Sequence, residues 1–76
     1  MKEQKQISDL GLAASLLACG EAIITVDKTN PRRVMFCFEY SDYLDELIDS
    51  YWSDSLKVSG RLLMEQIKLL KSRIYS

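Results

Sequence analysis

The segment from Leu10 to Cys19 is apolar on every side of the helix that its residues predict. Leucines occupy two sides of the helical wheel, and the remaining side is a small-residue strip of Gly11, Ser15 and Ala18. A helix without a polar face must be buried in its own fold or covered by a partner. A chain of 76 residues has only a thin core. We therefore expect one domain over residues 1–76 whose core needs this helix, with residues 1–7 frayed.

The residues that flank this segment predict where the helix starts and stops. Ser8 is a suitable N-cap, Asp9 complements the helix dipole in the first turn, and Gly20 is a natural C′ stop. The sequence therefore predicts a helix over Asp9–Cys19. The segment is too short for a membrane span, which takes about 20 residues. The acids Glu3 and Asp9 argue against a lipoprotein signal ending at Cys19, so no membrane association is expected.

A β-hairpin is predicted after this helix. Residues 22–26 are β-branched and short, and residues 34–40 form a second apolar run with alternating faces. The connection over residues 27–33 contains Asn30 and Pro31, which suit the first two positions of a turn. This loop is too long for a two-residue hairpin, so its tip should project. In the second strand, Val34, Phe36 and Phe38 are expected to share one face, and Met35, Cys37 and Glu39 the other.

Two further helices follow, each after a serine suited to cap it. Ser41 precedes residues 42–52 and Ser59 precedes residues 60–74, and in both ranges apolar side chains recur at helical spacing. Between them, residues 56–58 are a short extended stretch that could add a third strand or lie across the core. The order α-β-β-α-(β)-α predicts an α+β domain in which a small antiparallel hairpin packs with three helices.

The charges are segregated along the chain, although the formal net charge is only −1. Six acids and no base lie between Glu39 and Asp54, whereas five bases and one acid lie between Lys57 and Arg73. Any solvated helix shows such stripes, so a purely structural interpretation stays open. The alternative is an acidic docking stripe and a projecting two-arginine fork for a phosphate or a carboxylate. The acidic stripe consists of Asp42, Asp45, Glu46 and Asp49, and the basic turn contains Arg32 and Arg33.

The residues that most catalytic sites need are missing. Histidine is absent, which removes the usual general base and metal ligand. No Gly-rich phosphate loop or nucleophile motif occurs. Cys19 and Cys37 lie in apolar runs and are too few for a disulfide scaffold or a zinc site. We therefore expect no enzyme, no cofactor and no metal site, but buried thiols in a cytoplasmic protein.

An interaction role accounts for more of these features than catalysis does. It explains the helix without a polar face and the aromatic residues near the acidic stripe, which are typical interface anchors. Small domains often complete their core by self-association, so the small-residue strip is a candidate homodimer seam. Nucleic acid, bound through the basic turn and the C-terminal helix, is the alternative partner. The aromatic residues near the stripe are Tyr40, Tyr43, Tyr51 and Trp52.

A set of short motifs spread over nearly the whole chain resembles a known family. The most specific is the Asn30-Pro31-Arg32-Arg33 turn before the aromatic strand Phe36-Cys37-Phe38, followed by Tyr51-Trp52 and the ending 70–75. Together they resemble small bacterial and phage-borne proteins of unknown function. The resemblance implies no activity, but it suggests a mobile-element setting. We therefore expect a protein-interaction module, a phage-type inhibitor or regulator of a host or defence protein; the alternative is a nucleic-acid-binding accessory or regulatory protein.

Overall fold

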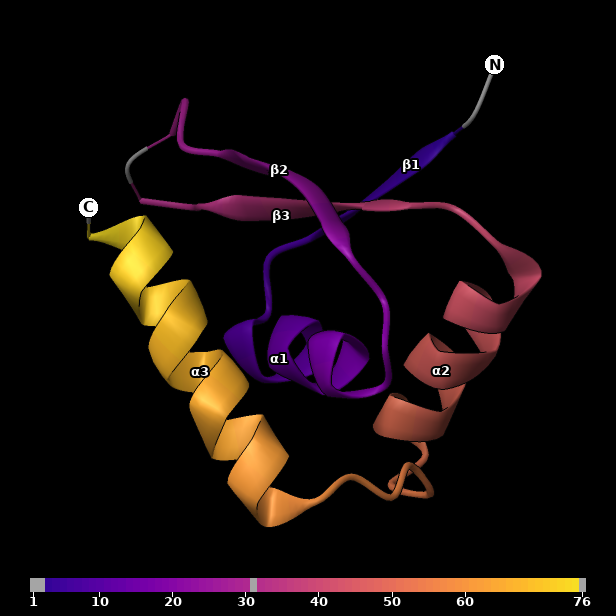
Figure 1. Ribbon diagram of the computed structural model, residues 1–76. Helices are drawn as coiled ribbons and strands as arrows, with labels where there is room; N and C mark the ends of the chain where they lie inside the picture. The colour runs from indigo at the N-terminus through magenta and orange to yellow at the C-terminus, as the bar shows by residue number, and fades with distance from the viewer. Residues whose placement is uncertain (1–2, 31, 76) are drawn as a thin grey trace.

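A computed structural model describes residues 3–30 and 32–75 of the chain. The fold has two layers, a three-stranded sheet and three helices that all lie on one side of it (Figure 1). The order of elements is β-α-β-β-α-α, which confirms the predicted α+β class. The elements are β1 (Gln4–Ile7), α1 (Leu10–Ala18), β2 (Ile23–Asp27), β3 (Met35–Glu39), α2 (Asp42–Trp52) and α3 (Gly60–Ile74).

The sheet contains a strand that the sequence pattern did not reveal. Its order is β1-β3-β2, and both pairings are antiparallel. The expectation that residues 1–7 are frayed is wrong for residues 4–7, which form β1; residues 1–2 lie outside the described residues. Ile7 pairs with Phe36 and is 5% exposed, so one apolar side chain anchors an otherwise exposed strand.

The third strand is therefore at the N-terminal end and not at residues 56–58. Those residues belong to no strand, but Leu56 and Val58 are half-buried. The backbone N–H of Leu56 donates to the carbonyl oxygen of Ser50, at 3.1 Å. This segment thus lies across the core, the second of the two arrangements expected from the sequence.

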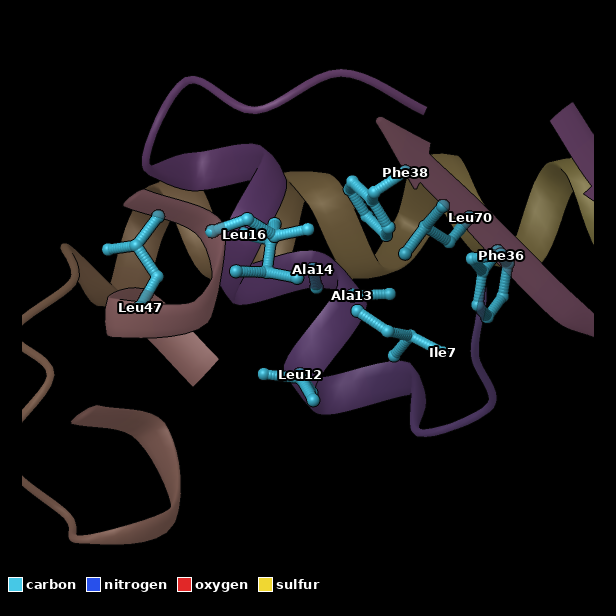
Figure 2. Close-up of a cluster of buried hydrophobic side chains, with 10 residues drawn as sticks. Ile7, Leu12, Ala13, Ala14, Leu16, Phe36, Phe38, Leu47 and Leu70 are labelled. Carbon is cyan, nitrogen blue, oxygen red and sulfur yellow. The ribbon is translucent and has the colours of Figure 1, made fainter. Parts of the chain in front are cut away.

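The core lies between the sheet and α1. Every residue of α1 from Leu12 to Leu16 is buried, which confirms that this helix without a polar face is enclosed, here by its own chain. In Figure 1, α1 runs beneath the sheet with α2 and α3 on either side. Figure 2 shows Phe36 and Phe38 of β3, Leu16 of α1 and Leu70 of α3 gathered in this core. The core cluster consists of Ile7, Leu12, Ala13, Ala14, Leu16, Phe36, Phe38, Leu44, Leu47 and Leu70.

Short polar side chains set the helix starts. Ser41 and Ser59 cap α2 and α3 as predicted, and their hydroxyls accept hydrogen bonds from the third residue that follows each. At α1 the prediction of Ser8 is wrong, because the Oδ1 of Asp9 accepts the Leu12 N–H at 2.9 Å. Asp9 has extended backbone angles, so the helix begins one residue later than expected. Gly20 adopts φ +97°, as its predicted role after the helix requires.

Candidate interaction surface

Helix α2 separates into a buried side and an exposed side. Leu44 and Leu47 are buried, and Ile48 and Tyr51 pack against them from the same side. The opposite side carries three acids, with Tyr43 and Trp52 at its two margins. We call this surface the α2 outer face, and its residues are Asp42, Tyr43, Glu46, Asp49 and Trp52.

Two aromatic side chains on the α2 outer face are largely exposed to solvent. Tyr43 is 55% exposed and Trp52 is 63% exposed. The Trp52 ring packs edge-on against Tyr51, with ring centroids 5.1 Å apart and an interplanar angle of 85°. Trp52 is therefore held in place from one side while most of its surface stays open to a partner.

The acids of the stripe predicted from the sequence differ in the contacts that they make within the fold. Asp45 accepts a hydrogen bond from the Tyr40 hydroxyl at 2.7 Å, and its Oδ1 lies 3.9 Å from the Nζ of Lys5. Asp45 thus links α2 to the ends of β1 and β3. The side chains of Glu46 and Asp49 make no hydrogen bond or ion pair with other described residues. Within the stripe, these exposed carboxylates are available for binding.

The hydrogen bond between Tyr40 and Asp45 predicts how the stability of the fold changes at alkaline pH. The hydrogen bond to Asp45, together with the negative charges of Asp45, Asp42 and Glu3, raises the pKa of the Tyr40 phenol above its usual 10.0. A raised folded-state pKa means that this stabilising contribution is complete below pH 10 and is lost as the pH rises through the folded-state pKa. Changing Asp45 to asparagine should move this ionisation to lower pH, as measured by tyrosinate absorbance. Glu46→Gln is the matched control, and an equal shift in both variants would contradict the assignment.

The basic turn lies in the loop that joins β2 to β3. The backbone N–H of Arg32 donates to the side-chain oxygen of Asn30, and that of Arg33 donates to the Asn30 carbonyl oxygen, both at 3.0 Å. The role expected for Pro31 lies outside the described residues. Both arginine side chains are exposed.

The fold places the basic turn beside the last turn of α3. Figure 1 shows the hairpin loop and the C-terminal end of α3 at the same side of the molecule. Between them is a groove of about 410 Å³, here called the basic groove. Its lining combines two arginines and Tyr75 with apolar residues from three elements. The residues that line the groove include Leu10, Arg32, Arg33, Val34, Ile74 and Tyr75.

The small-residue strip is largely occupied by the chain itself. Ser15 is 3% exposed, and its hydroxyl donates to the Gly11 carbonyl oxygen at 2.8 Å. A Cβ on Gly11 would lie 2.8 Å from the Tyr51 hydroxyl oxygen, so α2 approaches α1 closely at this point. Ala18 is half-buried. The strip is therefore not an open seam, because its small residues serve the packing of α1 within one chain.

This close approach predicts coupling between Gly11 and Tyr51. Alanine is favoured over glycine in a helix by up to about 1 kcal/mol, but in Gly11→Ala the contact with the Tyr51 hydroxyl should cancel that gain. In a Tyr51→Phe background, the nearest ring atom is 3.9 Å away and only Asp9 Oδ1, at 3.3 Å, stays close, so the same substitution should become more favourable than in the wild type. Urea unfolding of the four chains measures the coupling. The same effect of Gly11→Ala in both backgrounds would refute it.

Both cysteines are free thiols. Cys37 is buried at 3% exposure, whereas Cys19 is half-buried. Burial, followed by the negative charge of Glu21, raises the pKa of the Cys19 thiol, which disfavours the reactive thiolate. Within residues 3–30 and 32–75, no three metal-binding side chains are placed to share an ion. In the same part of the chain, no helix is both long enough and apolar enough to cross a membrane.

A comparison with models of known protein families shows to which family this chain belongs. Residues 2–76 match the model described as a domain of unknown function, DUF5659. The chain belongs to the DUF5659 family. This confirms membership of a family without an assigned function, which the short motifs suggested. No curated protein and no solved structure matches the chain.

Because the DUF5659 description assigns no activity, the function has to be argued from the surface. The sequence identified the aromatic residues around the acidic stripe but could not rank them. Tyr51 is half-buried and Tyr40 hydrogen-bonds to Asp45, so Tyr43 and Trp52 are the two that stay free for contact. Tyr75 was not among the predicted site residues, although at 84% exposure it borders the basic groove.

Proposed function

We propose that this DUF5659 domain is a small protein-interaction module that binds a basic surface of another protein through the α2 outer face. The observation that carries the proposal is the 63% exposure of Trp52 beside carboxylates that the fold does not use. Tryptophan and tyrosine are enriched among residues that dominate binding energy, and charge complementarity sets specificity and association rate. Trp52 is already packed against Tyr51, so less conformational freedom is lost on binding.

The proposed mode of action is occlusion. Carboxylates three and four residues apart on a helix have Cβ atoms about 5–6 Å apart, so a row of them presents a regular line of negative charge. Such a line suits a basic groove that otherwise receives an anionic ligand such as a nucleic acid. In the mobile-element setting that the family resemblance implies, the partner is a cytoplasmic host or defence protein and this chain is its inhibitor or regulator.

Affinity capture with variants of the α2 outer face tests this proposal. The wild-type chain should retain a partner that Glu46→Lys/Asp49→Lys fails to retain. Trp52→Ala should weaken binding of the same partner about thirtyfold in a titration, as loss of an aromatic anchor does. The matched control is Glu3→Lys/Glu65→Lys, which reverses two exposed acids outside α2. A partner that binds all four chains equally would contradict the proposal.

Nucleic-acid binding is the second candidate, favoured by the meeting of the basic turn with the end of α3. Lys71 lies in the last turn of α3, so its charge adds to those of Arg32 and Arg33 at this side of the molecule. Mobility shifts with duplex and single-stranded DNA at low salt distinguish the two candidates. A shift that is lost in Arg32→Glu/Arg33→Glu and kept in Glu46→Lys/Asp49→Lys would favour this function over the first.

A further inference from the structure

The basic groove combines positive charge with apolar surface. Arg32 and Arg33 supply the charge, and both side chains are exposed. Leu10 and Val34 line the groove as half-buried side chains, and Tyr75 borders it at 84% exposure. A ligand that fits this groove must therefore carry negative charges next to aromatic or aliphatic groups.

The α2 outer face of the same chain has this chemistry. Its acids are opposite in sign to the arginines of the groove, and Tyr43 and Trp52 offer large exposed apolar areas. In Figure 1, α2 lies on one side of α1, and the hairpin loop and the C-terminal end of α3 lie on the other. The two surfaces cannot meet within one chain, but they can meet between two copies.

We propose that the α2 outer face of one copy docks in the basic groove of the next. The contact is heterologous, so it continues into an open chain of copies or closes into a ring. A net charge of −1 leaves little overall repulsion between copies, while the separated charges attract one another. This inference rests on the α2 outer face as a binding surface, as the proposed function does, but it needs no outside partner. Assembly would compete with that partner for the same surface.

Sedimentation velocity of the full chain tests the inference. At low salt, raising the chain concentration from micromolar to about 1 mM, the range of weak association, should at least double the weight-average mass from 8.7 kDa. At about 0.5 M salt, where exposed charges are strongly screened, the mass should return to that of the monomer. Arg32→Gln/Arg33→Gln and Glu46→Gln/Asp49→Asn should each be monomeric alone. Mixed in equal amounts, they should form a heterodimer that does not extend, because each keeps one intact surface.

A charge-swapped chain provides the most specific test. Combining Arg32→Glu, Arg33→Glu, Glu46→Lys and Asp49→Lys leaves the net charge at −1 and restores complementarity with the signs exchanged. This chain should assemble with itself again, and its circular dichroism should match that of the wild type. A wild-type chain that stays monomeric at low salt, neutral variants that assemble like the wild type, or a folded charge-swapped chain that does not assemble would each overturn the inference. Capture of an outside partner is a separate measurement, so failure of this inference and failure of the proposed function can be told apart.

Discussion

Replacing Phe38 with alanine should remove a large part of the free energy that keeps the protein folded. Phe38 is fully buried in the central strand of the sheet. Truncation of a buried phenylalanine costs about 3–5 kcal/mol, and a domain of this length has a total stability of roughly 4–11 kcal/mol. Urea unfolding followed by circular dichroism measures the loss.

The matched control for Phe38 is Ile24 on the neighbouring strand β2. Ile24 is 50% exposed at the irregularity in the β2 register, so Ile24→Ala removes little buried surface. We expect its effect to stay within about 1 kcal/mol. If Phe38→Ala were no more destabilising than Ile24→Ala, the position of the core described here would be wrong.

Replacing Ile7 with aspartate should destabilise the protein by a similar amount. Ile7 is the one buried residue of β1, and it is paired with Phe36. An aspartate there places a charge in the core without a partner, at a cost of about 3–5 kcal/mol. Thermal and urea unfolding should both shift strongly.

The adjacent residue tests the register of the same strand. Gln6 pairs with Cys37 and is exposed, so Gln6→Asp adds the same charge on the side away from the helices. Its expected effect is below about 1 kcal/mol, the span of strand propensities. A strand that is frayed, as residues 1–7 were expected to be, would make Ile7→Asp as harmless as Gln6→Asp.

The helices and the hairpin could be predicted because local patterns specify them. Helical spacing of apolar residues and the caps Ser41 and Ser59 gave α2 and α3, and Asn30 marked the turn. Strand β1 has no such pattern, since three of its four residues are polar and exposed. It forms because β3 has a free edge and Ile7 fills a place in the core, and both conditions depend on residues far away in the sequence.

The residue types of the candidate site could be predicted from the sequence. Which of its acids make contacts within the fold, and which stay free, could not. Helical spacing alone groups Asp45 with the other acids of the stripe. Its contacts with Tyr40 and Lys5 arise only when β1 and β3 pair beside the start of α2. Likewise, the basic groove requires the hairpin loop and the end of α3 to meet, so Arg33 and Tyr75 share a site that no local pattern indicates.

The central claim is that the α2 outer face is free of folding roles and available for binding. The most direct test is the unfolding free energy of Tyr43→Ala/Glu46→Lys/Asp49→Lys relative to the wild type. All three side chains are exposed, so the account predicts a change within about 1 kcal/mol. A loss of more than about 2 kcal/mol, which exposed positions away from special features rarely show, would mean that this face stabilises the fold and would contradict the claim.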